Sequence, residues 1–133
     1  MISGRCECGS VTYEAGGNVS DFSHCHCSQC RRLHGAPYVS FAGVDEDKFK
    51  WTSGEEHVKI YASSQKNDRY FCDICGSHMQ VRSHLEPGVI YLTLGTTDGD
   101  PDLPAGYHQF ADSKAPWVEI LDGLPTYPGP IDD

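Results

Sequence analysis

RYFCDICGSHM, residues 69–79, has the local pattern of a zinc knuckle: two cysteines separated by two residues and followed by a glycine. The glycine, Gly76, tolerates the bent backbone that turns N–H groups toward the two sulfur atoms. One knuckle supplies only two of the four ligands that a structural Zn²⁺ requires. We therefore expect Cys72 and Cys75 to have a partner pair elsewhere in the chain.

The natural partner pair is Cys6 and Cys8, in the segment RCECG at residues 5–9. Together with Cys72 and Cys75 it predicts a closed four-cysteine site that joins the start of the chain to its middle. Structural zinc contributes on the order of 10 kcal/mol to folding, which a small sheet domain needs.

Removing those four leaves the cysteines of SHCHCSQCRR, residues 23–32, which are Cys25, Cys27 and Cys30. Three protein ligands and an exchangeable fourth position are the usual anatomy of catalytic zinc. We therefore interpret this group as a second, open zinc site and expect two Zn²⁺ ions per chain.

Three alternatives to an open zinc site remain at this stage. A histidine, either a distant one or His24, His26 or His34, could complete a second structural site, although the middle residue of a CxC pair tends to point away from the metal. A thioredoxin-like redox pair requires a βαβ context and a long helix. A disulfide framework would leave one of the seven cysteines over, and a reducing compartment would keep its bridges open.

Composition narrows the class of protein. The chain has 133 residues, enough for a single domain spanning 1–133, and 38% of them are hydrophobic. Its formal net charge of −9 disfavours nucleic-acid binding, which depends on cationic contacts. No apolar run has the length of a membrane helix, and the first ten residues contain no apolar region typical of a secretory signal. The expected location is the cytoplasm, without membrane association.

The hydrophobic pattern predicts a mainly β fold built of antiparallel strands, with little helix. Segments with alternation or β-branched enrichment, separated by turn residues, are 10–15, 38–44, 57–62, 78–83 and 89–95. One short helix is expected at residues 28–35, with Ser28 as its cap and Gly35 closing it in the left-handed conformation. The proline-rich tail, 124–133, is expected to be an extended strap that frays at its last residues.

Four sequence blocks resemble a known family. They are GRCECGSVTYEA (4–15), CHCSQCRRLHGAP (25–37), DRYFCDICGSHM (68–79) and HQFADSKAPWVEILDGLPTY (108–127). In this order they are similar to the glutathione-dependent formaldehyde-activating enzyme family, which includes centromere protein V. The resemblance covers about residues 4–127 and leaves 128–133 as an acidic tail.

The resemblance implies a β-tent fold, with several coiled antiparallel sheets related to zinc ribbons. It implies a structural zinc held by Cys6, Cys8, Cys72 and Cys75, and a catalytic zinc held by Cys25, Cys27 and Cys30. The activity it implies joins formaldehyde to glutathione as S-(hydroxymethyl)glutathione, a carbon–sulfur lyase reaction in reverse.

An anionic tripeptide substrate needs a local basic patch on this acidic chain, and Arg31, Arg32, Arg69 and Lys114 are the candidates. The alternative for Arg31 and Arg32 is a solvated helix face. For Lys114 it is a packing corner, in which Trp117 and its neighbouring proline hold the strap.

The seven histidines are expected to be mostly exposed, with His26 and His108 the two of interest. The leading hypothesis is a zinc-dependent enzyme that acts on a small aldehyde and a small-molecule thiol. One competing hypothesis is a zinc-stabilised β module for protein interaction. Another is a thiol-dependent enzyme with a different electrophile or thiol.

Overall fold

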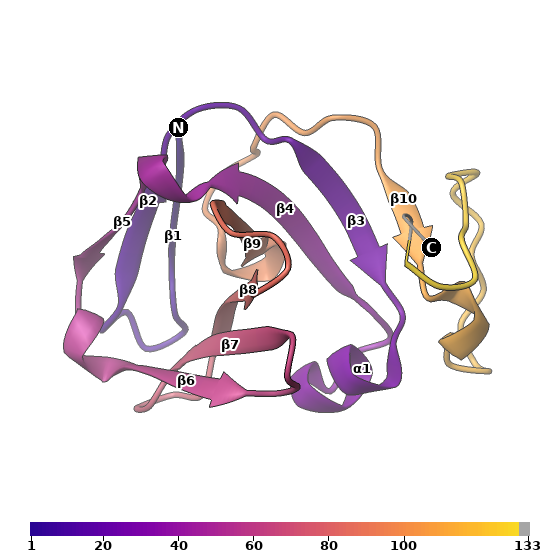
Figure 1. Ribbon diagram of the computed structural model, residues 1–133, viewed down its shortest axis with the longest axis horizontal. Helices are drawn as coiled ribbons and strands as arrows, with labels where there is room; N and C mark the ends of the chain where they lie inside the picture. The colour runs from indigo at the N-terminus through magenta and orange to yellow at the C-terminus, as the bar shows by residue number, and fades with distance from the viewer. Residues whose placement is uncertain (131–133) are drawn as a thin grey trace.

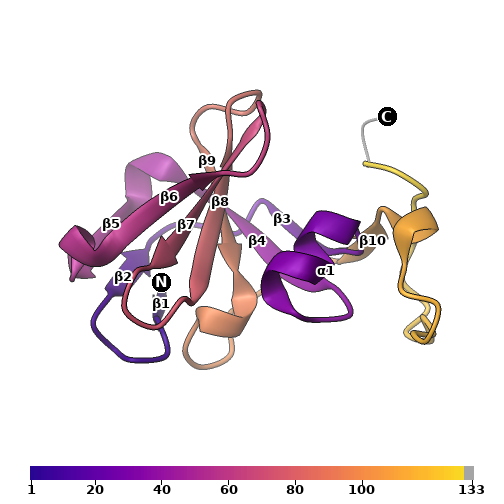
Figure 2. The same cartoon turned by 90° about the horizontal axis from the view of Figure 1, so that it is seen from below.

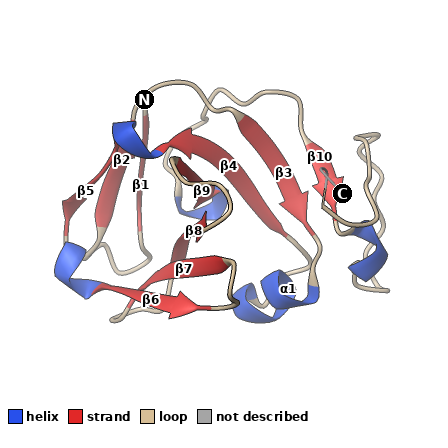
Figure 3. Ribbon diagram, in the orientation of Figure 1, coloured by secondary structure: helices blue, strands red, loops and turns tan. Residues whose placement is uncertain are grey.

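The computed structural model describes residues 1–130, and within them short strands are accompanied by one α-helix, which lies at the lower edge in Figure 3. The expected fraying of the acidic end falls on residues 131–133, outside the described residues. The elements are β1 (Ile2–Arg5), β2 (Thr12–Ala15), β3 (Asp21–Cys25), α1 (Ser28–His34), β4 (Val39–Asp45), β5 (Phe49–Ser53), β6 (Val58–Ala62), β7 (Asn67–Cys72), β8 (His78–Ser83), β9 (Val89–Thr93) and β10 (Tyr107–Gln109).

The mainly β fold expected from the sequence is confirmed. Each of the five predicted strands corresponds to an observed one, β2, β4, β6, β8 or β9, with ends that differ by at most two residues. The alternation predicted for the first of them holds, because Val11, Tyr13 and Ala15 are all buried on one face. The other five strands, β1, β3, β5, β7 and β10, are not among the predicted segments, although the β5 sequence FKWTS also alternates apolar and polar residues.

In the described part of the chain the strands form two open sheets. One has the order β1-β2-β5, and the other has the order β10-β3-β4-β9-β8-β7-β6. Figure 1 shows them around a triangular outline, with the small sheet on one side, β3 and β4 on a second, and β6 and β7 on the third.

One pairing departs from the antiparallel expectation, since β10 lies parallel to β3 and pairs His108 with His24. A long connection leads from β9 to β10, so no hairpin turn fixes the direction of β10. The parallel pair places β10 directly beside the strand that ends at Cys25.

The buried residues form two clusters, and each contains cysteines. The larger lies around Val11, Tyr13, Met79, Ile90 and Leu92, and it includes Cys6 and Cys72. The smaller contains Cys25, Cys30, Val39 and Phe41. Each predicted metal site is therefore set against its own apolar packing.

The N-cap of helix α1 lies one residue earlier than expected. Cys27, not Ser28, is the N-cap, because its Sγ accepts the Cys30 N–H at 3.3 Å and Ser28 is already helical. Gly35 ends the helix in the left-handed conformation at φ 58°, as predicted. The first cysteine of the CxxC motif therefore caps the helix, and the last one lies in its first turn.

The C-terminal segment after β10 runs along the outer edge of the long sheet as an extended strap (Figure 2). His108 donates its N–H to the Pro125 carbonyl, and its own carbonyl accepts the Tyr127 N–H. The expected packing corner at Trp117 is wrong, since Trp117 is 71% exposed and the smaller Ala115 is buried instead. Among the described residues, no helix is long and apolar enough to cross a membrane.

Candidate metal centres and the adjoining cavity

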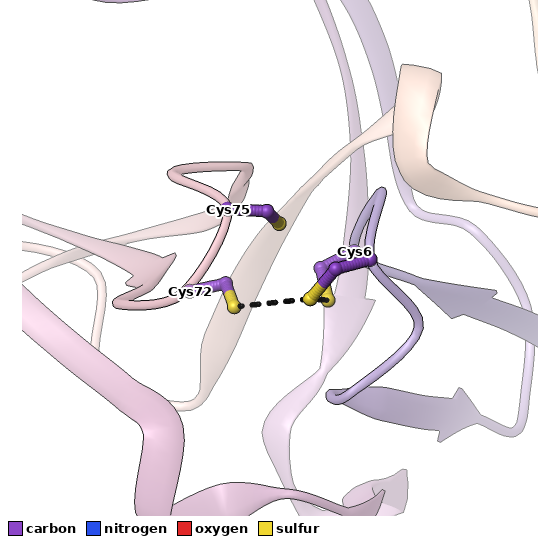
Figure 4. Close-up of side chains that lie close together, drawn as sticks. Cys6, Cys72 and Cys75 are labelled. Carbon is purple, nitrogen blue, oxygen red and sulfur yellow. Dashed lines mark hydrogen bonds between the residues drawn. The ribbon is translucent and has the colours of Figure 1, made fainter.

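The two knuckles predicted from the sequence meet in the structure. The ligand atoms of Cys6, Cys8, Cys72 and Cys75 all lie within 4.8 Å of one another. Figure 4 shows the sulfur atoms of Cys6, Cys72 and Cys75 directed toward one shared space. Strand β7 delivers Cys72, and the turn after β1 delivers Cys6 and Cys8.

The spacing of these sulfur atoms fits a tetrahedral Zn²⁺. With Zn–S bonds of about 2.3 Å, the edge of a ZnS₄ tetrahedron measures about 3.8 Å. The Cys6–Cys8 Sγ atoms lie 3.6 Å apart and the Cys8–Cys72 Sγ atoms 3.9 Å apart. The donor set and its geometry therefore suit a closed structural zinc.

The two halves of this cluster share a left-handed glycine and a backbone N–H that donates to the first sulfur, although the donors stand at different distances along the chain. Gly9 and Gly76 both have left-handed φ angles, 80° and 81°, after their respective cysteine pairs. In the first half the Val11 N–H donates to Cys6 Sγ at 3.3 Å, and in the second the Ile74 N–H donates to Cys72 Sγ at 3.4 Å. These donors stabilise thiolate charge, which metal binding requires.

The second cluster comes from one short stretch of chain, with Cys25 at the end of β3, Cys27 at the helix cap and Cys30 in α1. Their ligand atoms also lie within 4.8 Å of one another, and among the described residues no histidine or carboxylate joins them. Hydrogen bonds from the Cys25 and Cys30 side chains hold the pKa of Cys27 far below that of a free thiol, and the same contact with Cys27 raises the pKa of Cys25. One thiolate is therefore favoured before any metal binds.

A buried cation stands beside this cluster. Arg69 of β7 is 3% exposed, and its Nη2 donates to Cys30 Sγ at 3.5 Å and to Gln29 Oε1 at 3.1 Å. Its Nε donates to Ser63 Oγ at 3.1 Å. These contacts fix the guanidinium against α1, where it offsets the negative charge of the thiolates.

The three cysteines open into a cavity of about 650 Å³. Its wall mixes apolar and aromatic side chains with charged ones of both signs. The residues that line it are Asp21, Ser23, Cys25, Cys27, Gln29, Cys30, Phe41, Lys66, Asn67, Arg69, Val81, Ser83, Leu85, Glu86, Tyr91, Tyr107, Gln109, Phe110 and Pro130. A smaller pocket, of about 170 Å³, lies against Cys6.

Of the four basic residues proposed from the sequence, Arg69 lines the cavity and Arg31, Arg32 and Lys114 do not. Lys114 donates to the carbonyls of Ala115 and Val118, within its own turn. Two further wall residues, Lys66 and Gln29, were not predicted from the sequence. Only the position of Gln29 between Cys27 and Cys30 could have indicated that it lies near the cavity.

The expectation that the histidines are mostly exposed is wrong. Only His84 of the seven is exposed, and His26 and His108 are fully buried. The His26 Nε2 and His108 Nδ1 atoms lie 2.7 Å apart, and His108 Nε2 donates to Asp122 Oδ2 at 2.8 Å. Burial lowers the pKa of His26 to about 4, so its ring is neutral at pH 7. The parallel β10 creates this pair, which no local pattern could show.

Comparison with known proteins yields consistent matches. The profile of a family described as glutathione-dependent formaldehyde-activating enzyme matches residues 1–113. A Colletotrichum graminicola protein named "Putative glutathione-dependent formaldehyde-activating enzyme" is 34% identical over 80 residues, 59% of this chain and 42% of that protein. A Schizosaccharomyces pombe protein named as an uncharacterized lyase is 32% identical over 74 residues, 56% of this chain and 52% of that one.

The chain thus spans about half the length of these curated relatives. A crystal structure of a Rhodobacter sphaeroides protein superimposes with a TM-score of 0.63 and 24% identity, covering 74% of this chain and 90% of that one. This structural match supports the fold alone.

Proposed function

The chain belongs to the glutathione-dependent formaldehyde-activating enzyme family, and on that premise we propose that it joins a small aldehyde, such as formaldehyde, to a thiol, such as glutathione. One observation carries the proposal: within residues 1–130 the three-cysteine cluster has no fourth protein ligand, and it faces a cavity of about 650 Å³. A closed site of four protein ligands leaves no position for a substrate, whereas an open one does.

Cys25, Cys27 and Cys30 would hold the catalytic Zn²⁺, and Cys6, Cys8, Cys72 and Cys75 the structural one. A Zn²⁺ held by three cysteines favours the thiolate form of an incoming thiol, which is mostly protonated at pH 7 when free. Three thiolates give that unit a net negative charge, so thiol activation suits it better than water activation.

The chain's own residues contribute binding and charge. Arg69 places a permanent cation at the inner end of the cavity and holds Cys30 Sγ. Phe110 and Phe41 form apolar wall beside the cysteines and limit the water around the reacting sulfur. Lys66 adds a second cation at the cavity wall for an anionic thiol.

The reaction needs no redox partner. The thiol sulfur forms a bond to the carbonyl carbon, the carbonyl π electrons move to oxygen, and the proton lost by the thiol ends on that oxygen. The product is a hydroxymethyl thioether, and every atom of thiol and aldehyde is retained. The reverse direction is a carbon–sulfur lyase reaction.

Calorimetry tests whether the thiol sulfur reaches the three-cysteine site. Glutathione titrated at pH 7 into the zinc-loaded protein, in buffers of different ionisation enthalpy, should release close to one proton per molecule bound, because the free thiol is mostly protonated. The control ligand is S-methylglutathione, which cannot lose a thiol proton. The control protein is Cys27→Ser.

Binding without proton release, or equal affinity for S-methylglutathione, would show that the sulfur does not reach the site. That outcome favours the protein-interaction module over the enzyme. If protons are released but formaldehyde consumption is no faster than in a protein-free control, the thiol-dependent enzyme with another electrophile becomes the better assignment.

A further inference from the structure

We propose a third metal site in this protein, for a borderline divalent cation such as Zn²⁺ or Co²⁺, formed by His24, His108 and Asp122. The proposal does not depend on the proposed function, because none of these residues lines the cavity at the three-cysteine cluster. It rests on how the two edge strands and the strap bring the three side chains together.

The ligand atoms of His24, His108 and Asp122 all lie within 4.8 Å of one another. The parallel register of β10 and β3 places His108 directly across from His24, and their ring centroids are 4.8 Å apart. Asp122 comes from the strap, and its Oδ2 already accepts a hydrogen bond from His108 Nε2 at 2.8 Å. Two imidazoles and one carboxylate suit Zn²⁺, Fe²⁺ or Co²⁺, and they do not suit Mg²⁺ or Ca²⁺.

Contacts outside the cluster orient both rings as metal ligands require. His24 Nδ1 lies 2.7 Å from Ser40 Oγ, which leaves Nε2 as the lone-pair donor. His108 Nδ1 lies 2.7 Å from His26 Nε2, which likewise leaves Nε2 for the metal. Histidines that bind metals characteristically hold their second nitrogen in such a hydrogen bond. A surface His–Asp ion pair has no need of these two outer partners.

Burial and charge also fit an exchangeable site. The His108 side chain is 2% exposed, His24 is half-buried and the Asp122 side chain is 43% exposed, so solvent reaches the cluster at the carboxylate. A net charge of −9 concentrates cations near the surface. With three protein ligands the remaining positions are left to water, so this site binds its ion more weakly than the two cysteine clusters.

Metal binding here would fasten the strap to β3, the strand that ends at Cys25. Pro130 of the strap forms part of the cavity wall. Backbone bonds between His108 and the strap already bring Asp122 close. Binding the ion replaces the His108–Asp122 hydrogen bond and places the His108 proton on Nδ1, which then donates to His26 Nε2.

The test uses the whole chain loaded with Zn²⁺ and dialysed until metal analysis gives two Zn²⁺ per chain, one for each cysteine cluster, and then titrated with CoCl₂. We expect one further Co²⁺ per chain, with visible d–d absorption and no thiolate-to-cobalt charge-transfer band. Asp122→Ala and His24→Phe should each weaken this binding about tenfold or more. The matched control is Asp68→Ala, which removes the carboxylate of the exposed His84–Asp68 pair, 2.9 Å apart and without a second histidine.

Three results of the cobalt titration would contradict the proposed site. No cobalt bound beyond the zinc already present, a charge-transfer band, or an equal loss in Asp68→Ala would each overturn the proposal. Thermal unfolding of the zinc-loaded variants without cobalt checks that they fold. Asp122→Ala removes the acceptor of both the buried His108 Nε2 and the Leu124 N–H, so its unfolding temperature should fall, and cobalt is titrated well below that temperature, where a loss of binding reports the site itself.

Discussion

The two cysteine clusters differ most in how far apart along the chain their ligands lie. The four-cysteine cluster joins residues 64 positions apart, Cys8 and Cys72, whereas the three-cysteine cluster comes from the single stretch 25–30. Burial does not separate the two clusters, because each has two buried cysteines, Cys6 and Cys72 in one and Cys25 and Cys30 in the other. The exposure of the cysteines alone therefore does not assign a role to either cluster.

Chain separation explains the different roles that we assign. A metal that joins distant segments closes a long loop, so its binding free energy becomes folding free energy. A metal held by one turn and a short helix fixes little beyond those residues, and its loss leaves the rest of the fold in place. The three-cysteine cluster is therefore free to exchange ligands through the cavity.

The largest expected effect is on folding. Cys72→Ser should abolish cooperative unfolding and solubility, since zinc binding of about 10 kcal/mol rivals the whole stability of a small domain. Cys27→Ser should retain the fold, because serine is itself a good N-cap for α1, and should lose thiol-dependent activity. Thermal unfolding and zinc content measure both. Equal destabilisation by the two changes would remove the distinction between the clusters.

Chelation should show the same difference in the parent protein. A mild chelator should take one of two Zn²⁺ ions first while circular dichroism stays constant, and the second ion only together with unfolding. The three-cysteine cluster loses its ion first because it has fewer protein ligands and opens to solvent through the cavity. Loss of both ions in one step, or a single ion after zinc loading, would contradict this order.

The features of the fold and of the metal sites that were predicted from the sequence are mostly those set by neighbouring residues. The CxxC-Gly pattern, the CxC-x₂-C run and the alternating strands are local, and each predicted its part of the structure. The sequence also predicted that Cys6 and Cys8 join Cys72 and Cys75, because a structural zinc site needs four ligands and this choice leaves the three cysteines of one local stretch together.

Contacts that depend on which strands pair, and in which direction, could not be predicted. The parallel entry of β10 buries His26 against His108, and nothing near either residue indicates this contact. Arg69 was one of four basic candidates, and its selection needs the register of β7 against the loop at Ser63 and α1. Trp117 was expected to pack because large aromatic residues usually do, yet the strap leaves it exposed.

A change next to the three-cysteine cluster should affect chemistry more than stability. Arg69→Met removes the donor to Cys30 Sγ and leaves Gln29 Oε1 with one contact fewer. We expect glutathione affinity and turnover to fall about tenfold, since a charge-assisted hydrogen bond contributes roughly 1.5 kcal/mol or more. The control is Arg82→Met, because Arg82 stacks on Tyr70 and pairs with Glu46 outside the cavity. Similar activity loss in both variants would mean that Arg69 acts through general packing.

The smallest expected effect concerns the four-cysteine cluster. Ser77 Oγ accepts the Glu7 N–H at 2.9 Å and lies 3.2 Å from Cys75 Sγ, so one hydroxyl links the two knuckles. Ser77→Ala should lower stability by about 1 kcal/mol, because the exposed Glu7 N–H can bond to water instead. Zinc should leave the four-cysteine cluster several-fold more readily, while glutathione binding stays unchanged.

The matched change at the other cluster is Ser28→Ala, which removes an exposed hydroxyl beside Cys27 that caps nothing. Stability and zinc retention should both stay within experimental error of the parent, because surface changes of this kind alter stability by less than about 0.5 kcal/mol. Competition with a chromophoric chelator measures zinc retention in the two serine variants side by side. Were Ser28→Ala to loosen zinc as much as Ser77→Ala, a single hydroxyl beside a cysteine would matter equally at both clusters. Zinc retention at the four-cysteine cluster would then not depend on the hydroxyl that links its two distant segments. The two clusters would differ only in their number of ligands.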